Sequence, residues 1–192
     1  MSFYSIASYI EQFYPAYYSI ERYPANRCVR IRKTSEVWGI LGNFASTPLS
    51  IMGVRVKSAE QLFQLMKFTD EEPIMAVYKA RNPKFTAKHW EKTHRRGDWG
   101  SILVDAMKFC LSMKFEQSPT FLKALLQTED RFIVEDQTSF PKKTADTWGA
   151  KLCGDEYVGP NLLGRLLMEL RDQGSLEYHL PPDGLLFVQY LK

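Results

Sequence analysis

The chain lacks several features that define common protein classes. Its three cysteines stand far apart in the sequence, so neither a disulfide framework nor a cysteine-type zinc site is expected. Its three histidines have no metal-ligand spacing either. No apolar run approaches the length of a membrane-spanning helix, and no basic segment followed by an apolar one opens the chain. We therefore expect a soluble, intracellular and cytoplasmic protein that holds no metal and does not enter a membrane.

The chain also lacks the common phosphate-binding and nucleophile motifs. It has no Gly-x-Gly-x-x-Gly, no P-loop and no nucleophile elbow, so no cofactor is expected. The net charge of +3 permits contact with nucleic acid without predicting it. A length of 192 residues with 45% hydrophobic residues suits one domain with a sizeable core. The sequence specifies no oligomeric state.

The segment from Ser58 to Phe68 carries the most informative pattern. Ser58 with Gln61 three residues later is a capping-box arrangement, which predicts that a helix begins here. On this helix two apolar flanks border a narrow polar line formed by Glu60, Gln64 and Lys67. Such a line would face a cleft, and a carboxylate is favoured in the first turn by the helix dipole. The alternative is an ordinary amphipathic helix with both charges in solvent.

Capping residues and periodicity predict the other elements. Pro83 and Pro119 follow cap residues and start helices, and Gly174 ends the last one. Asp98 is expected to cap the helix that begins at Trp99. The expected helices are 5–14, 73–81, 83–90, 99–116, 119–128 and 161–171, and the expected strands are 29–33, a hairpin within 49–56 and 131–135. We expect an aromatic-rich N-terminal extension (1–28) packed on a domain (29–174), followed by a tail (175–192) with a short hairpin.

The extension admits two interpretations. Its tyrosines and phenylalanines, with arginines from position 22 onward, would suit stacking on nucleic-acid bases beside phosphates. The alternative is that the rings pack against the surface of the domain.

Other candidate positions lie near the last helix and in a basic loop. Gly164 is inside a helix, where glycine is unfavourable, so another helix or a ligand should approach its backbone. Asn161, in the first turn, would suit a phosphate or a ribose hydroxyl. Arg95 and Arg96 would suit a phosphate, and a solvated loop is the alternative.

Five blocks of the chain resemble, in order, motifs of the NADAR, or YbiA-like, family, and they cover about residues 29–173. They are Trp38-Gly39-x-x-Gly42-Asn43-Phe44, similar to Y-G-x-x-S-N-F; Ser58-x-Glu60-x-x-Phe63-Gln64-x-x-Lys67-Phe68, similar to S-E-H-Y-F-Q-A-Q-K-F; Arg96-x-Asp98-Trp99 with Met107, Lys114-Phe115 and Gln117, similar to R-x-D-W…M…K-F-x-Q; Asp146-Thr147-Trp148-Gly149, similar to D-x-x-W-G; and Asn161 to Arg171, similar to N-x-L-G-x-L-L-M-E-x-R.

The resemblance implies an α+β, mainly helical fold: a single compact domain with a few short strands and a polar cleft. It also implies hydrolysis of an N-glycosidic bond, in phosphorylated riboflavin-pathway intermediates or in ADP-ribose attached to guanine of DNA. Glu60 would act as acid/base or stabilise the oxocarbenium ion. The implied catalytic residues are Glu60, Lys33, Lys67 and Asp146, and the implied substrate-binding residues are Asn43, Phe44, Gln64, Arg96, Trp99, Trp148, Gly149, Asn161 and Gly164.

Elementary chemistry agrees with these roles. Cleavage of an N-glycosidic bond develops positive charge on the sugar, which a carboxylate stabilises, and negative charge on the base, which a proton donor stabilises. Lys67 could donate that proton, hold a phosphate or keep Glu60 ionised. A lysine with a lowered pKa could instead attack ring-opened ribose, and Lys33 matches a position where some family members have lysine.

The chain departs from the family pattern at three places. Gln61 replaces a histidine, which removes one proton carrier. Asp146 is one residue closer to Trp148 than in the family, so Ala145 could occupy the expected place. A Gly-Ala-Lys sequence at 149–151 replaces G-D-G.

Three functions are therefore compared. The leading one is removal of ADP-ribose from guanine in DNA, because the arginines near positions 22–32 and 95–96 favour a substrate with several phosphates. The second is hydrolysis of phosphorylated riboflavin intermediates, and the third is binding of ADP-ribose or NAD without turnover.

Overall fold

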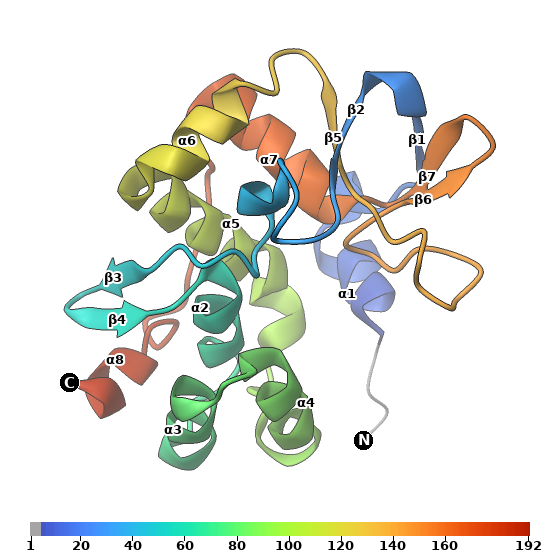
Figure 1. Cartoon of the computed structure of the whole chain (residues 1–192). Helices are drawn as coiled ribbons and strands as arrows, with labels where there is room; N and C mark the ends of the chain where they lie inside the picture. Colours follow the sequence, from blue (N-terminus) through green and yellow to red (C-terminus); the bar gives the residue numbers. More distant parts are fainter. Residues whose placement is uncertain (1–4) are drawn as a thin grey trace. The chain divides into compact units, whose positions relative to one another are not determined.

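The computed structural model describes residues 5–192 and has the mainly helical α+β fold that the sequence predicts (Figure 1). The chain divides into two compact units, each built from separate stretches of sequence. Unit 1 contains the residues up to Gly42 and Pro119–Leu176, and unit 2 contains Asn43–Ser118 and Glu177–Lys192. Within residues 5–192 no helix has the length and apolar character that crossing a bilayer requires.

Unit 1 combines two small sheets with three α-helices. Strands β1, β7 and β6 form an antiparallel sheet in that order, and β2 pairs in parallel with β5. Helix α7 packs along β5 (Figure 1). The elements are α1 (Ile6–Phe13), β1 (Glu21–Pro24), β2 (Cys28–Ile31), α6 (Pro119–Leu126), β5 (Phe132–Glu135), β6 (Lys151–Cys153), β7 (Glu156–Gly159) and α7 (Leu162–Gln173), with short 3-10 turns at Pro15–Tyr17, Ala25–Arg27 and Gly39–Leu41.

In unit 1, two side chains of α7 form hydrogen bonds to the aromatic-rich N-terminal extension. The hydroxyl of Tyr17 donates to a Glu169 carboxylate oxygen at 2.6 Å. The Arg165 guanidinium donates to the carbonyl oxygens of Ala16 and Tyr17 and to the hydroxyl of Ser19. The part of the extension up to Ile20 is thus tied to a helix that lies more than 140 residues later in the chain. The first four residues of the expected extension lie outside the described range.

Unit 2 is mainly helical. Met52 (φ 49°) and Gly53 (φ 92°) turn the hairpin, and both have the left-handed conformation that a tight two-residue turn requires. Every residue of α2 is buried. The elements are β3 (Leu49–Ile51), β4 (Val54–Val56), α2 (Ala59–Leu65), α3 (Glu71–Lys79), α4 (Pro83–His94), α5 (Trp99–Gln117) and α8 (Phe187–Leu191).

The structure corrects several sequence expectations. The tail contains turns and α8 instead of a hairpin, because the apolar side chains of Phe187 and Val188 are buried together on one helical turn. Strands β1, β6 and β7 are not expected from the sequence, since each has only three or four residues. Asp98 precedes α5, but its side chain makes no capping hydrogen bond and binds an arginine instead.

Candidate active site

Glu60 is a buried carboxylate in the first turn of α2. The Ser58 hydroxyl accepts a hydrogen bond from the backbone N–H of Gln61 at 3.2 Å, which starts the helix as the sequence predicts. The backbone N–H of Glu60 donates to the carbonyl oxygen of Asn43 at 3.0 Å. The Glu60 side chain is held by Gln64, one turn later, whose Nε2 donates to Glu60 Oε1 at 2.8 Å. Glu60 is 6% exposed, so its carboxylate lies in the interior of unit 2.

The surroundings of Glu60 shift its proton affinity in two directions. Burial raises the pKa of Glu60 above its ordinary value, because a charged carboxylate loses hydration. The positive charge of Lys84, the hydrogen bond from Gln64 and the positive charge of Lys67 oppose this rise. A carboxylate balanced in this way can change protonation state during a reaction, as acid/base catalysis requires.

Two further polar atoms near Glu60 have no partner among the described residues. They are Oδ1 of Asn43 and Oε1 of Gln64, both buried. Asn43 Nδ2 donates to the sulfur of Met107 at 3.2 Å, a weak acceptor. Buried acceptors without a donor are rare in folded proteins and commonly mark a place where water or a ligand supplies the donor. These atoms would accept hydrogen bonds from sugar hydroxyl groups.

Lys67 lies among aromatic rings and one carboxylate. Its Nζ lies 5.6 Å from the ring centre of Trp99 and 5.7 Å from that of Phe63, and the two rings meet edge to face. It also forms an ion pair with Glu91 of α4. Burial lowers the pKa of Lys67, and the neighbouring carboxylates, Glu91 first, oppose that change.

Glu91 and Lys84, both on α4, are residues that the sequence reasoning missed. The Nζ of Lys84 lies 5.2 Å from the ring centre of Phe44, and its charge is the largest electrostatic influence that favours ionised Glu60. Neither residue belongs to a motif, and α4 precedes the next recognisable block. Only the packing of α4 on α2 brings them to the site.

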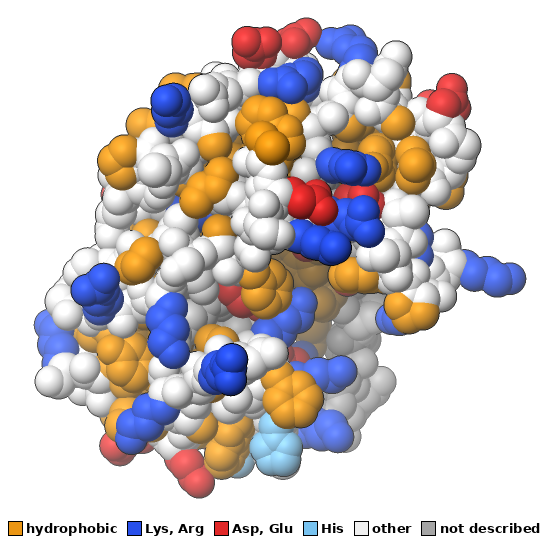
Figure 2. All heavy atoms as spheres, in the orientation of Figure 1, with side chains coloured by type: hydrophobic (Ala, Val, Ile, Leu, Met, Phe, Trp, Pro, Cys, Tyr) orange, Lys and Arg blue, Asp and Glu red, His pale blue; other side chains and the backbone are white. Residues whose placement is uncertain are grey.

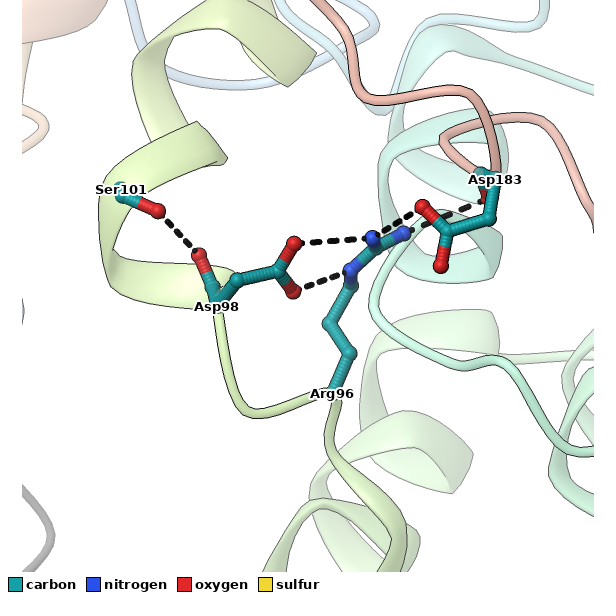
Figure 3. Close-up of polar contacts among 4 residues, drawn as sticks. All are labelled: Arg96, Asp98, Ser101 and Asp183. Carbon is teal, nitrogen blue, oxygen red and sulfur yellow. Dashed lines mark hydrogen bonds and ion pairs between the residues drawn. The ribbon is translucent and has the colours of Figure 1, made fainter.

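Arg96 is enclosed by two carboxylates of unit 2 (Figure 3). Its Nε and Nη2 donate to the two oxygens of Asp98 at 2.6 and 3.0 Å, and Nη2 also donates to Asp183 at 2.7 Å. Nη1 donates to the backbone oxygen of Asp183 at 3.4 Å. The hydrogen bonds from Arg96 lower the pKa of Asp98. These contacts use four of the five N–H groups of a guanidinium, so they describe a buried arginine that ties the C-terminal tail to the start of α5. Phosphate binding by Arg96 stays a prediction.

Asn161 and the first turn of α7 make structural contacts in unit 1. The Asn161 side chain accepts from the backbone N–H of Glu135 at 3.1 Å and donates to the carbonyl oxygen of Ile133 at 2.8 Å. The backbone N–H groups at 161–163 donate to the carbonyl oxygens at 147–149. The start of α7 is thus occupied by the chain itself, and Asn161 is fully buried.

The close approach expected at Gly164 is to the neighbouring strand. A Cβ at Gly164 would lie 2.0 Å from the carbonyl oxygen of Ile133 in β5, and one at Gly149 would lie 2.4 Å from that of Glu135. Strand packing therefore accounts for both glycines. Ligand contacts at these positions stay predictions.

The remaining predicted residues of unit 1 are less enclosed. The side chain of Asp146 accepts from Gln137 Nε2 and from the backbone N–H of Trp148, so this carboxylate organises its own loop. Asp146 is exposed and Trp148 half-buried. Lys33 is exposed in the turn after β2. In residues 5–192 no group of three or more histidine, cysteine, aspartate or glutamate side chains could hold a metal ion.

Unit 2 thus brings together Glu60, Gln64, Lys67, Trp99 and Asn43. Phe44, also in unit 2, lies against Lys84, and the other candidates belong to unit 1 or make structural contacts. Gln61, which replaces the family histidine, is directed elsewhere. Its Nε2 donates to the carbonyl oxygen of Tyr78 at 2.8 Å and its Oε1 accepts from the backbone N–H of Lys57. Gln61 therefore links α2 to α3.

Comparison with known proteins identifies the family of the chain. A family model described as the NADAR domain matches residues 7–173. The N-glycosidase YbiA of Escherichia coli (strain K12) is 30% identical over 151 residues, which are 78% of this chain and 89% of that protein. A riboflavin biosynthesis protein of Vibrio vulnificus is 29% identical over 157 residues, 80% of this chain and 40% of that protein. The NMR structure of E. coli YbiA superposes with a TM-score of 0.61 at 30% identity, covering 81% of this chain and 90% of that one. Because the family model covers most of the chain, the chain belongs to the NADAR domain family.

Proposed function

We propose that this chain, an N-glycosidase of the NADAR type, removes ADP-ribose from guanine in DNA. The observation that carries the N-glycosidic cleavage in this proposal is the buried Glu60 carboxylate, held by Gln64 and subject to the positive charges of Lys67 and Lys84. A buried carboxylate with a fixed orientation is what a positively charged sugar in the transition state requires.

In the proposed reaction Glu60 faces the anomeric carbon of the ribose. As the bond to the base lengthens, positive charge develops on the sugar, and ionised Glu60 stabilises it or removes a proton from the attacking water. Gln64 fixes Oε1, so Oε2 is the oxygen that would meet the substrate. Water attacks the anomeric carbon, the bond to the base breaks, and the electron pair of that bond leaves with the base.

Lys67 is the proposed proton donor to the leaving base. Burial lowers its pKa, which makes the ammonium group a better acid than an exposed lysine. Phe63 and Trp99 exclude water from one side of the ammonium group, and Glu91 keeps it charged until the substrate binds. Lys67 is also the better candidate for an imine nucleophile than Lys33, because Lys33 is exposed.

The buried acceptors of Asn43 and Gln64 are proposed to bind the ribose hydroxyl groups. Phe44, which is 52% exposed, and Trp99 are proposed to contact the substrate rings. Further contacts with the substrate are proposed for Asp146, Trp148, Gly149, Asn161, Gly164, Arg96 and Lys33, in addition to the structural contacts that several of them make.

The alternative is an N-glycosidase of phosphorylated riboflavin intermediates. The name of the Vibrio vulnificus relative, a riboflavin biosynthesis protein, supports it. Glu60 and Lys67 would play the same roles in both reactions. Only a comparison of the two substrates therefore distinguishes the two functions.

The test incubates the protein with an oligonucleotide that carries ADP-ribosylated guanine and, separately, with a phosphorylated riboflavin-pathway intermediate. Release of ADP-ribose from DNA at the higher kcat/KM is expected. Glu60→Gln should lower kcat by about a hundredfold or more without unfolding the protein. The matched control is Glu72→Gln, an exposed glutamate in the first turn of α3, which should keep full activity. Turnover of the riboflavin-pathway intermediate alone would favour the alternative, and unchanged activity of Glu60→Gln would refute the proposed role of Glu60.

A further inference from the structure

Helix α4 presents a row of lysines on its exposed surface. Lys84, Lys88 and Lys92 are spaced four residues apart, so they fall on one face of the helix, and we name them the lysine stripe. All three are exposed, and Ala87 is the only fully buried residue of α4. Figure 2 shows basic side chains, a histidine and hydrophobic groups gathered over the region that α4 occupies in Figure 1.

Within the described chain the stripe forms no ion pair, although the charge of Lys84 acts on the buried Glu60 carboxylate. No ion pair among residues 5–192 involves any of the three lysines. The helix has a single acidic residue, Glu91, and this carboxylate is already paired with Lys67. Solvated faces usually mix both signs of charge, whereas this one is uniformly basic.

The geometry of the stripe suits a polyanionic strand. Four residues of helix rise about 6 Å, so the stripe extends about 12 Å along α4. One strand of duplex DNA carries a phosphate about every 3.4 Å of axis, so three or four phosphates face that length. Phe85, 74% exposed, lies next to Lys84 and offers a ring on which a base can stack.

The stripe also begins at the candidate active site. Lys84 is in the first turn of α4, above the ring of Phe44. A strand lying on α4 would therefore lead toward Glu60.

We propose that α4 binds the phosphate backbone of the DNA strand that carries the modified base, through the lysine stripe, with Phe85 as a stacking platform. This surface rests on the proposed function. It would bind the phosphate backbone of DNA, which a mononucleotide substrate lacks. The lysines contact phosphates and not base edges, so the surface binds DNA without sequence preference.

The first test measures binding and does not depend on catalysis. Fluorescence anisotropy gives the Kd of an unmodified 12-nucleotide single strand for the wild type and for Lys88→Ala/Lys92→Ala, which leaves Lys84 beside the active site intact. The Kd of this variant should rise about tenfold at 0.15 M salt, and the slope of log K against log salt should become shallower by about 1.4. Phe85→Ala should raise the Kd about fivefold.

A charge-matched variant controls for net charge. Lys123→Ala/Lys192→Ala also removes two exposed lysines, one on α6 and one at the C-terminus. It should bind the strand like the wild type. Equal effects of the two double variants, or no effect of either, would overturn the proposed surface.

The second test compares two substrates. The KM of Lys88→Ala/Lys92→Ala should rise about tenfold for the modified oligonucleotide and stay unchanged for free ADP-ribosylated guanosine. An equal change for both would overturn the proposal. Should the wild type cleave neither substrate, the proposed function fails, and the binding measurement still decides whether α4 holds DNA.

Discussion

Asn161 and Asn43 occupy family-motif positions, but their surroundings predict opposite consequences of mutation. The Asn161 carboxamide bonds to the backbone of β5 through both of its polar ends. Asn43 has a buried oxygen without a donor and bonds only to a methionine sulfur through its nitrogen. We predict that Asn161→Ala mainly lowers stability and that Asn43→Ala mainly lowers activity.

The loss of stability expected for Asn161→Ala comes mainly from the backbone groups of β5 that lose their hydrogen-bond partner. The variant leaves one backbone N–H and one carbonyl of β5 without partners at a fully buried position, at about 1–3 kcal/mol each. Residue 161 has φ 49°, a left-handed conformation that asparagine adopts more easily than alanine, which adds about 1 kcal/mol. The total is about 3–7 kcal/mol, a large part of the 5–15 kcal/mol that stabilises a typical domain.

Urea denaturation followed by circular dichroism measures the free energy of unfolding, and steady-state kinetics at a temperature where both variants are folded measure KM and kcat. Asn43→Ala should change the free energy of unfolding by less than about 1 kcal/mol, because the carboxamide oxygen has no partner and its nitrogen bonds only to a weak sulfur acceptor. Its KM should rise about tenfold. The reasoning is refuted if Asn161→Ala unfolds like the wild type and raises KM instead, since its carboxamide would then contact substrate.

Three further predictions concern charge and packing. Lys84→Met removes a charge that lowers the Glu60 pKa, so the limb of the pH–rate profile that titrates with Glu60 should move to higher pH; an unmoved profile would contradict this coupling. Asp183→Asn removes one carboxylate from buried Arg96 and should lower stability by roughly 1 kcal/mol in urea denaturation while speeding proteolysis of the tail. Gly164→Ala places a methyl group 2.0 Å from a backbone oxygen of β5 and should cost more than about 3 kcal/mol, and a thermal midpoint equal to that of the wild type would contradict this packing.

Local patterns in the sequence predict most of the helices and the first-turn environment of Glu60. The cap at Ser58, the hairpin turn at Met52 and Gly53, and the end of α7 at Gly174 depend on residues within a few positions of each other, so the sequence reveals them. Local patterns do not specify the ends of every helix: α4 continues to His94, beyond the expected end at residue 90, because its amphipathic spacing contains no stop signal.

The partners of the candidate residues could not be predicted in the same way. Arg96 is held by a carboxylate 87 positions later, in a tail outside the family motifs. Lys84 and Glu91 reach the site only because α4 packs on α2. The position of Asn161 at the start of a helix predicts contact with a ligand, whereas its side chain hydrogen-bonds to the backbone of β5. Each difference results from tertiary contacts between residues that are distant in sequence.

The parallel pairing of β2 with β5 has a consequence for how the chain is made. Cys28 and Phe132 are partners across 104 intervening peptide steps (132 − 28). At ribosomal speeds of about 5–20 residues per second, β5 is synthesised roughly 5–20 seconds after β2. Residues 43–118 of unit 2 form one unbroken stretch and can begin to fold during that interval. The apolar segment of β2 therefore stays without its partner strand for seconds during synthesis, when an unpaired strand can associate with other chains or with chaperones.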